Sequence, residues 1–267
     1  MKVAINYSDS RFERNRRWNT MTAKLFGGVD KVVEYSPSDI DLEFYEENSK
    51  VLNQSRGGGY WLWKPYFIAK TLSDLSDGDY LFYSDSGAVY LNSVDYLIEI
   101  LESNSDEIML FESPLIEKQW TNKHLIKYMG MENSAALEEN QIIASYLLIK
   151  KSAKTVAFIN EYFELCRKEE LVTDLMTRKS EEAFDHRHDQ SILSLLAKQL
   201  GIKPYRDPSD YGVFPFRYFS VSRLFRVNNY INNYPVILLS NRKAHPLYYW
   251  LKYKVRVMLS KVVTYDI

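Results

Sequence analysis

The stretch Tyr80-Leu81-Phe82-Tyr83-Ser84-Asp85-Ser86-Gly87 indicates the fold of this chain most clearly. Its first four residues predict a short buried strand, and the polar residues after them predict an abrupt turn. In open α/β sheets, ligands bind where a strand ends in such a loop. Asp85 brings a carboxylate to that edge, which suits a hard divalent cation, and Gly87 lets a ligand approach the backbone closely. The alternative is an ordinary turn in which Asp85 bonds its own backbone.

The order of strand, turn and helix recurs along the chain. Further strands are predicted at 3–7, 32–35, 108–111, 142–149 and 236–239, and helical apolar spacing at 65–72, 94–101, 156–163 and 192–200. Strands that alternate with helices form a mainly parallel sheet covered on both faces. We therefore predict one α/β domain over residues 1–245, followed by a basic, aromatic, amphipathic C-terminal helix in the tail 246–267.

The charge and cysteine content exclude some classes of protein. The 267 residues include 34 Lys+Arg and 35 Asp+Glu, and the net charge of -1 offers no bulk attraction for nucleic acid. A single cysteine, Cys166, forms no internal disulfide, which points away from an oxidising compartment. No segment reaches the roughly 18 apolar residues of a membrane span, and the start of the chain does not read as a signal peptide. We expect a cytoplasmic protein with at most peripheral membrane contact.

The glycine-rich stretch RGGGYWLWKPY, residues 56–66, is a second candidate binding segment. Three glycines permit backbone conformations closed to other residues, and exposed amides together with Lys64 near a helix start would hold phosphate. Trp61 and Trp63 would be platforms for a sugar or a base. The segment lacks both the triphosphate loop ending and the dinucleotide fingerprint. The alternative is a loop whose two tryptophans anchor the next helix in the core.

Two further polar clusters follow along the chain. His186-Arg187-His188-Asp189-Gln190 precedes a leucine-rich helix and is more polar than a helix cap requires, although Asp189 would also serve as an ordinary cap. As a cap it would be replaceable by Asn at little cost in stability. Glu112, Glu117 and Trp120 form a cluster after a strand, for which a solvated face is the alternative. These clusters supply the carboxylates that acid or base chemistry needs.

With these segments the chain resembles bacterial nucleotide-sugar glycosyltransferases of GT-A type, of the kind found in capsule, lipopolysaccharide and other surface-glycan biosynthesis. The resemblance lies in four segments in the same order. They are GGGYWLWKPYFI at 57–68, YLFYSDSGAV at 80–89, EKQWTNKHLIKYMG at 117–130 and FDHRHDQSILSLLAKQLGI at 184–202. It implies a GT-A-like, Rossmann-like mainly parallel sheet flanked by helices, and the transfer of a sugar from a nucleoside diphosphate to a glycan or lipid-linked acceptor.

The resemblance also implies a divalent cofactor, Mn²⁺ or Mg²⁺. In GT-A enzymes an Asp-x-Asp motif at a strand end binds a cation that bridges the donor diphosphate. The matching triplet here is Asp85-Ser86-Gly87, so Gly87 stands in place of the second acidic residue. Metal ligation would fall on Asp85 with help from elsewhere. His245 is the candidate, since some of these enzymes add a late histidine ligand, and a purely structural histidine is the alternative.

The same resemblance assigns donor contacts. The loop after the first strand usually holds the nucleotide base, which points to Asn6, Tyr7 and Arg11. Asp189-Gln190 resembles the Asp-Gln pair with which some of these enzymes face the donor sugar. UDP is the expected nucleotide, with galactose or galactofuranose as the sugar. Donor contacts are also expected from Trp61, Trp63, Lys64, Ser86, Gly87 and His188.

The chemistry of glycosyl transfer adds a requirement of its own. A departing diphosphate has to be stabilised, and a carboxylate has to lie near the anomeric carbon. Asp189 is the first candidate for that carboxylate and Glu117 the second. A rival interpretation is a non-catalytic carbohydrate-binding or scaffold protein on the same fold, suggested by the missing acidic residue and by aromatic residues at 15% of the chain. A nucleotidyltransferase ranks last, because its glycine-rich loop after the first strand is absent.

The C-terminal tail predicts a peripheral contact with an anionic membrane. From residue 241 to 267 there are six basic residues and one acidic residue, in a chain of net charge -1. Apolar residues follow helical spacing on one face, and basic and aromatic residues suit a lipid interface. The alternative is that the face packs on the domain or on a second copy. The residues of this face are Leu247, Trp250, Leu251, Val255, Met258, Leu259 and Val262.

Overall fold

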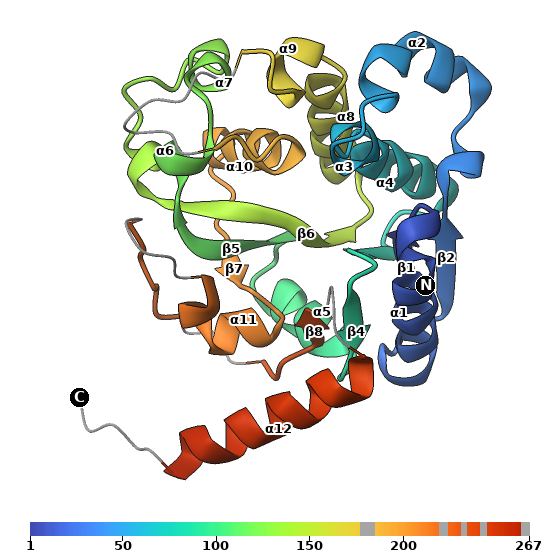
Figure 1. Ribbon diagram of the computed structural model, residues 1–267, viewed down its shortest axis with the longest axis vertical. Coiled ribbons are helices and arrows are strands. Elements are labelled where there is room, and N and C mark those ends of the chain that lie inside the picture. Colours follow the sequence, from blue (N-terminus) through green and yellow to red (C-terminus); the bar gives the residue numbers. More distant parts are fainter. Residues whose placement is uncertain (177–184, 219–223, 231–233, 241–244, 263–267) are drawn as a thin grey trace.

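The computed structural model of this protein describes residues 1–176, 185–218, 224–230, 234–240 and 245–262. Within these residues a six-stranded sheet of order β2-β1-β3-β6-β5-β7 forms the centre of the molecule (Figure 1). Its strands are β1 Lys2–Tyr7, β2 Lys31–Tyr35, β3 Tyr80–Ser84, β5 Ile108–Ile116, β6 Asn140–Lys150 and β7 Tyr205–Arg206. A separate antiparallel pair consists of β4 Ala88–Tyr90 and β8 Leu238–Ser240.

The strand directions agree with the predicted α/β class. β1 pairs in parallel with both β2 and β3, and β5 pairs in parallel with β7. β6 runs antiparallel to both of its neighbours, β3 and β5. It is therefore the one strand of the central sheet, as far as the chain is described, that points the other way. The predicted mainly parallel sheet is confirmed.

Helices cover both faces of the sheet. In Figure 1, α4, α8 and α10 lie on one side of it and α5 on the other. The longer helices are α1 Glu13–Phe26, α2 Leu42–Leu52, α4 Trp63–Asp74, α5 Asp95–Ser103, α8 Ala153–Cys166, α10 Asp189–Gln199 and α12 Pro246–Val262. The shorter ones are α3 Gly57–Tyr60, α6 Glu117–Trp120, α7 Lys123–Tyr128, α9 Glu169–Val172 and α11 Asp210–Val213, with 3₁₀ turns at Ser10–Phe12, Pro37–Asp39, Ala135–Glu138 and Pro215–Tyr218.

The core has two layers because successive strand residues face opposite sides of the sheet. In β3, Leu81 and Tyr83 pack in the layer under α4, α8 and α10, while Phe82 packs in the layer under α5. In β6, Leu147 and Leu148 divide between the two layers in the same way. The central strands are thus buried on both faces, which explains their near-continuous apolar sequences.

Two of the differences from the sequence prediction bear on the candidate site. The polar, basic residues after β1 were not expected to form an element, yet they form the 14-residue helix α1. Its buried face is made of Asn19, Thr20, Thr22 and Ala23, so it carries little of the apolar periodicity by which helices are recognised. The strand predicted at 108–111 continues to Ile116 as β5, and Glu112 therefore lies inside a strand rather than after it.

The predicted C-terminal helix is present as α12, which runs along the outside of the domain in Figure 1. Tyr249 and Tyr253 pack toward the domain, where the Tyr249 hydroxyl donates to Asp210 at 3.0 Å. The opposite side exposes more than half of the Leu251, Val255 and Met258 side chains. Among the described residues, no helix combines the length and the apolar character that crossing a bilayer requires.

Candidate active site

A pocket opens at the carboxyl ends of β1 and β3. These strands are parallel neighbours, with Ile5 opposite Tyr83, so Tyr7 and Asp85 emerge at the same edge of the sheet. Ligands bind at this edge in open α/β folds. The pocket has a volume of about 300 Å³, which lies within the range of small-molecule sites. It is lined by Tyr7, Ser8, Asp9, Arg11, Phe12, Ser55, Gly57, Gly58, Trp61, Trp63, Asp85, Ser86 and Gly87.

The buried polar face of α1 supports the turn that carries Asp85. The Asn19 amide donates to the Ala88 carbonyl at 2.9 Å and to the Ser84 hydroxyl at 3.0 Å. Its carbonyl accepts from the Asn6 amide at 2.7 Å. Asn6, predicted to contact the base, therefore belongs to a buried network beneath the pocket and is not among the residues that line it.

Aromatic rings form one wall of the pocket. The rings of Tyr7 and Trp63 stack with centroids 3.8 Å apart and planes 19° apart. Both residues are more than 90% buried, and the Trp63 indole N–H donates to the Gly57 carbonyl at 3.0 Å. Trp61 is only partly buried and lines the same pocket. The tryptophans thus pack on the domain, as the alternative interpretation expects, and also line the pocket; their role as platforms for a sugar or a base stays a prediction.

The segment Gly57 to Trp61 forms a left-handed turn. All five of its residues have positive φ, including the non-glycine residues Tyr60 at 50° and Trp61 at 60°. A Cβ on Gly57 would come within 2.4 Å of the Trp61 ring, and one on Gly59 within 2.7 Å of the Leu52 backbone. Left-handed conformations cost non-glycine residues of order 1–3 kcal/mol each and are concentrated at functional sites. The glycines are needed for this turn, whether or not their amides hold phosphate.

His188 lies behind Trp61 and does not line the pocket. Its ring packs against Trp61 at 5.6 Å and Tyr60 at 4.8 Å, measured between centroids. His188 Nδ1 lies 2.8 Å from the Val172 carbonyl, and His186 Nε2 lies 2.8 Å from the Leu171 carbonyl. Burial is the main reason why the pKa of His188 is lowered to about 4 and that of His186 to about 3. Both rings are therefore neutral at pH 7.

These two histidines make stability depend on pH. The unfolded chain, in which His has a pKa near 6.5, binds more protons than the folded chain below that pH. Their contribution is therefore fully present above pH 6.5 and is lost as the pH falls toward 4. We expect each histidine to lower the free energy of unfolding by about 2 kcal/mol between pH 6.5 and 5. Urea denaturation at both pH values measures this loss.

The matched controls for this prediction are two single variants. His186→Asn should remove about half of the loss, whereas His245→Asn, at an exposed histidine, should leave it unchanged. If the free energy of unfolding of the wild type is the same at pH 6.5 and pH 5, the two buried histidines are not the source of any pH dependence.

Lys64 contacts both Asp85, which lines the pocket, and the buried Asp189. Its ammonium lies 2.8 Å from an Asp189 carboxylate oxygen and 3.7 Å from an Asp85 oxygen. The side chains of Lys64 and Asp189 are each only 4% exposed, while that of Asp85 is 25% exposed. The Tyr83 hydroxyl donates to Asp85 at 2.7 Å, and the Tyr162 hydroxyl donates to Asp189 at 3.3 Å. A buried ion pair of this kind costs about 3–5 kcal/mol of stability when one partner is removed.

Asp189 is placed behind the wall of the pocket. It is the first residue of α10, and His188 occupies the cap position. Burial raises its pKa, and the neighbouring Lys64 charge opposes that rise. Its neighbour Gln190 donates its amide to Gln141 at 2.7 Å and accepts from the Ala144 amide, away from the residues that line the pocket. Asp189 and Asp85 thus share Lys64 as an ion-pair partner. The local sequence does not reveal this arrangement.

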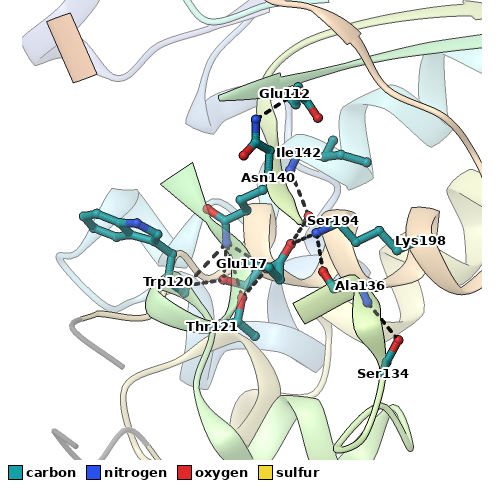
Figure 2. A network of polar contacts seen from close by, with 12 residues as sticks. Glu112, Glu117, Trp120, Thr121, Ser134, Ala136, Asn140, Ile142, Ser194 and Lys198 are labelled. Carbon is teal, nitrogen blue, oxygen red and sulfur yellow. Dashed lines mark hydrogen bonds and ion pairs between the residues drawn. The ribbon is translucent and has the colours of Figure 1, made fainter. Parts of the chain in front are cut away.

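Glu117 lies in a second buried network, shown in Figure 2. Its carboxylate pairs with the Lys198 ammonium at 2.9 Å and accepts from the Thr121 hydroxyl at 2.5 Å and from the Ser194 hydroxyl. Glu117 has no exposed surface and is not among the residues lining the pocket. The prediction of a solvated face for this cluster is wrong, because Glu112, Glu117 and Trp120 are all buried and Glu117 forms its ion pair away from water. Glu112 is likewise buried, and burial raises its pKa.

The described residues do not assemble the divalent metal site that the resemblance implies. Among them no three His, Cys, Asp or Glu side chains come together as a metal-binding group. Gly87 offers no side-chain ligand, and His245 packs edge-on against Trp18 with centroids 5.7 Å apart, outside the lining of the pocket. The charged group beside Asp85 is the Lys64 ammonium. This donor set does not fit a divalent cation, which usually takes several oxygen ligands.

Some residues of the pocket were not identified from the sequence as donor contacts. Asp9 caps the short turn after β1 and pairs with Arg11 at 2.6 Å, and Phe12 follows them. Ser55 comes from the end of the segment before the glycines. A polar turn after the first strand was the available signal for Asp9. Nothing in the local sequence distinguishes Phe12 or Ser55 from ordinary surface residues.

Comparisons with known proteins bear on the fold. No family model and no curated protein sequence matches this chain. The solved structure of mouse xyloside xylosyltransferase 1, in its apo form, superposes with a TM-score of 0.51 at 8% identity, covering 91% of this chain and 98% of that one. A galactosyltransferase, LgtC, in complex with donor and acceptor sugar analogs gives 0.49 at 14% identity, covering 100% and 98%. Apo GlyE of Streptococcus pneumoniae gives 0.46 at 16% identity, covering 97% and 62%.

The likeness to the xylosyltransferase extends over nearly the whole of both chains, and it is a likeness of structure rather than of sequence. The chain therefore has the GT-A-like α/β fold of a known glycosyltransferase, as its sequence predicts.

Proposed function

We propose that this protein is a glycosyltransferase that moves a sugar from a nucleoside-diphosphate sugar to a glycan or lipid-linked acceptor. The observation that carries the proposal is the pocket at the ends of β1 and β3, whose lining combines aromatic rings with the carboxylate of Asp85. Rings suit a base or a sugar, and a carboxylate accepts hydrogen bonds from sugar hydroxyls. The shared fold of a known glycosyltransferase supports the same class of reaction.

The residues divide into two groups in this proposal. Tyr7, Arg11, Trp61 and Trp63 would hold the nucleotide with its diphosphate, and Asp85 with the backbone at Ser86 and Gly87 would hold the sugar. Arg11 brings a positive charge to the pocket, although Asp9 shares it. Asp189 would act as a positioning residue, since it reaches the pocket only through Lys64. Its buried ion pair keeps the ammonium in place beside Asp85.

The resemblance in sequence suggests UDP as the nucleotide, galactose or galactofuranose as the sugar, and a surface-glycan pathway such as capsule or lipopolysaccharide synthesis. A donor-hydrolysis screen against UDP-, GDP-, CMP- and dTDP-sugars identifies the donor directly. Hydrolysis of one nucleotide class at least tenfold above the others is the expected result.

Isothermal titration of the free nucleotides tests the class of function. We expect one nucleoside diphosphate to bind, and Trp61→Ala to weaken that binding about tenfold, because base stacking on an aromatic ring contributes about 1–3 kcal/mol. Tyr96→Ala, at an exposed aromatic residue of α5 outside the pocket, is the matched control and should bind like the wild type. Binding of glycans with no affinity for any nucleotide would instead establish the non-catalytic alternative.

We also propose that the exposed side of α12 contacts an anionic membrane surface peripherally, where lipid-linked acceptors are assembled. Leu247, Leu251 and Met258 are each more than 55% exposed, and Lys252 and Lys254 are exposed beside them. Basic residues near an anionic surface contribute about 1 kcal/mol each. Partial burial of apolar side chains adds to this attraction. The contact is expected to be weak and sensitive to salt.

Cosedimentation with vesicles measures this contact. Full-length protein should partition onto anionic vesicles and detach in high salt, and the charge-reversal variant K252E/K254E should lose most of the binding. A chain ending at Ala244 should stay in solution. Because the two lysines are exposed, the charge reversal leaves the packed side of α12 intact. Equal partitioning of the variant and the wild type, or indifference to lipid charge, would exclude the contact.

A further inference from the structure

An ammonium group of the chain itself lies between two carboxylates at the candidate donor site. Lys64 Nζ is 2.8 Å from Asp189 Oδ2 and 3.7 Å from Asp85 Oδ1. Only Asp85 of these three residues lines the pocket, and Asp189 is enclosed in the core. A cation held between two carboxylates is the usual arrangement of a bridging metal ion in proteins that bind one through acidic side chains. Here the position between the carboxylates is occupied by a covalently attached cation.

The ammonium is held in place from several directions. Lys64 is the second residue of α4, three residues after the end of the left-handed turn at Trp61, and its side chain is 4% exposed. Its Nζ lies 5.5 Å from the centre of the Tyr83 ring and 5.9 Å from the centre of the Trp63 ring, both within the range of cation–π attraction. The Tyr83 hydroxyl also donates to Asp85, which orients that carboxylate. The charge is therefore fixed in position before any ligand binds.

We propose that Lys64 occupies the cation position between Asp85 and Asp189 and keeps a divalent metal out of the donor site, so that nucleoside-diphosphate binding requires no metal. This inference rests on the proposed function. A metal ion on Asp85 would lie close to the ammonium, and like charges at such short range repel strongly where water is largely excluded. The ammonium offsets one of the two carboxylate charges beside the pocket and so reduces the repulsion that an anionic diphosphate would meet there.

The acidic motif of this chain agrees with that role. Asp85 and Asp189 are already balanced in part by Lys64, and a second acidic residue at position 87 would add an unbalanced negative charge facing an anionic donor. Gly87 occupies that position instead. Gly87 in place of an acidic residue makes the motif a poor metal site, and it suits a site whose cation is the ammonium of Lys64. Lys64 is a positioning residue, because it contacts Asp85 and does not itself line the pocket.

Titration of Mn²⁺ into the metal-free protein, followed by electron paramagnetic resonance, tests the proposal without an activity assay. We expect no stoichiometric binding by the wild type at sub-millimolar Mn²⁺. The double variant Lys64→Met/Asp189→Asn leaves only one carboxylate without its ammonium partner, and its stability shows whether the protein stays folded when the ammonium is removed. Lys64→Met alone exposes both carboxylates to the ion and should bind Mn²⁺ at least tenfold more tightly than the wild type. Lys64→Arg keeps the charge and should resemble the wild type.

Nucleotide titrations give the second measurement. With EDTA or with Mn²⁺, the wild-type affinity for the preferred nucleoside diphosphate should agree within threefold, and Lys64→Met should weaken it at least tenfold in EDTA. Stoichiometric Mn²⁺ binding by the wild type that Asp85→Asn abolishes, or nucleotide affinity more than tenfold higher with Mn²⁺, would overturn the proposal. If no nucleotide binds under either condition, the proposed function fails, and the Mn²⁺ titration of the wild type alone decides whether Lys64 excludes a metal.

Discussion

Replacement of Asp85 by alanine is expected to reduce donor turnover by about 10³-fold while the protein remains folded. Asp85 is the carboxylate that lines the pocket beside the Lys64 ammonium, so its loss removes a preoriented contact with the donor. Loss of one preorganised polar group from an active site typically costs 10²–10³ in turnover. Its side chain is 25% exposed, and little packing is lost with it. Steady-state donor hydrolysis and thermal melting of the same preparations measure both effects.

The matched control for Asp85 is the other carboxylate of the pocket. Asp9 lines the same pocket but is engaged by Arg11 and by the turn after β1. Asp9→Ala should therefore reduce turnover less than tenfold. Turnover within threefold of the wild type in Asp85→Ala, or equal losses in the two variants, would show that Asp85 has no special position at the donor.

Replacement of Asp189 by alanine is expected to lower the free energy of unfolding by about 3–5 kcal/mol, the usual cost of leaving one member of a buried ion pair alone. Lys64 would lose its 2.8 Å partner and would keep the more distant Asp85, at 3.7 Å. Asp189→Asn should also be destabilised, since the amide carries no charge. If Asp189 were only a helix cap, Asn would replace it at little cost in stability. The buried ion pair with Lys64 therefore reverses the stability expected from the sequence. Urea denaturation at pH 7 measures the loss.

Glu117 offers the matched control for Asp189, because it forms another buried ion pair with a lysine, Lys198, away from the pocket. Glu117→Gln should also destabilise the protein but leave nucleotide affinity within twofold of the wild type. Asp189→Asn should weaken that affinity about tenfold, because the position of Lys64 depends on it. Equal nucleotide affinities in the two variants would separate Asp189 from the site and leave it a structural residue only.

The local pattern of the sequence was sufficient to locate the edge of the sheet where the pocket lies. The strand at Tyr80 to Tyr83 and the polar turn at Asp85 were both predicted, because a buried strand and its turn are encoded by adjacent residues. The glycine-rich segment was also recognised, since glycine is needed for backbone that other side chains obstruct. Helix α1 escaped prediction because its buried face bonds to the turn through polar groups rather than through apolar packing.

The sequence by itself determined the class of fold, the tail helix and the strand ends at which Tyr7 and Asp85 stand, since each depends on hydrophobic periodicity and turn chemistry within a few neighbouring residues. Only the tertiary structure decided which charged groups meet. Lys64 and Asp189 are 125 positions apart, and their ion pair exists because α4 and α10 pack on the same face of the sheet. The tertiary structure also enclosed Glu117 with Lys198 and placed His245 against Trp18, outside the lining of the pocket. Electrostatic partnership depends on distance in space and on the exclusion of water, and a linear pattern records neither.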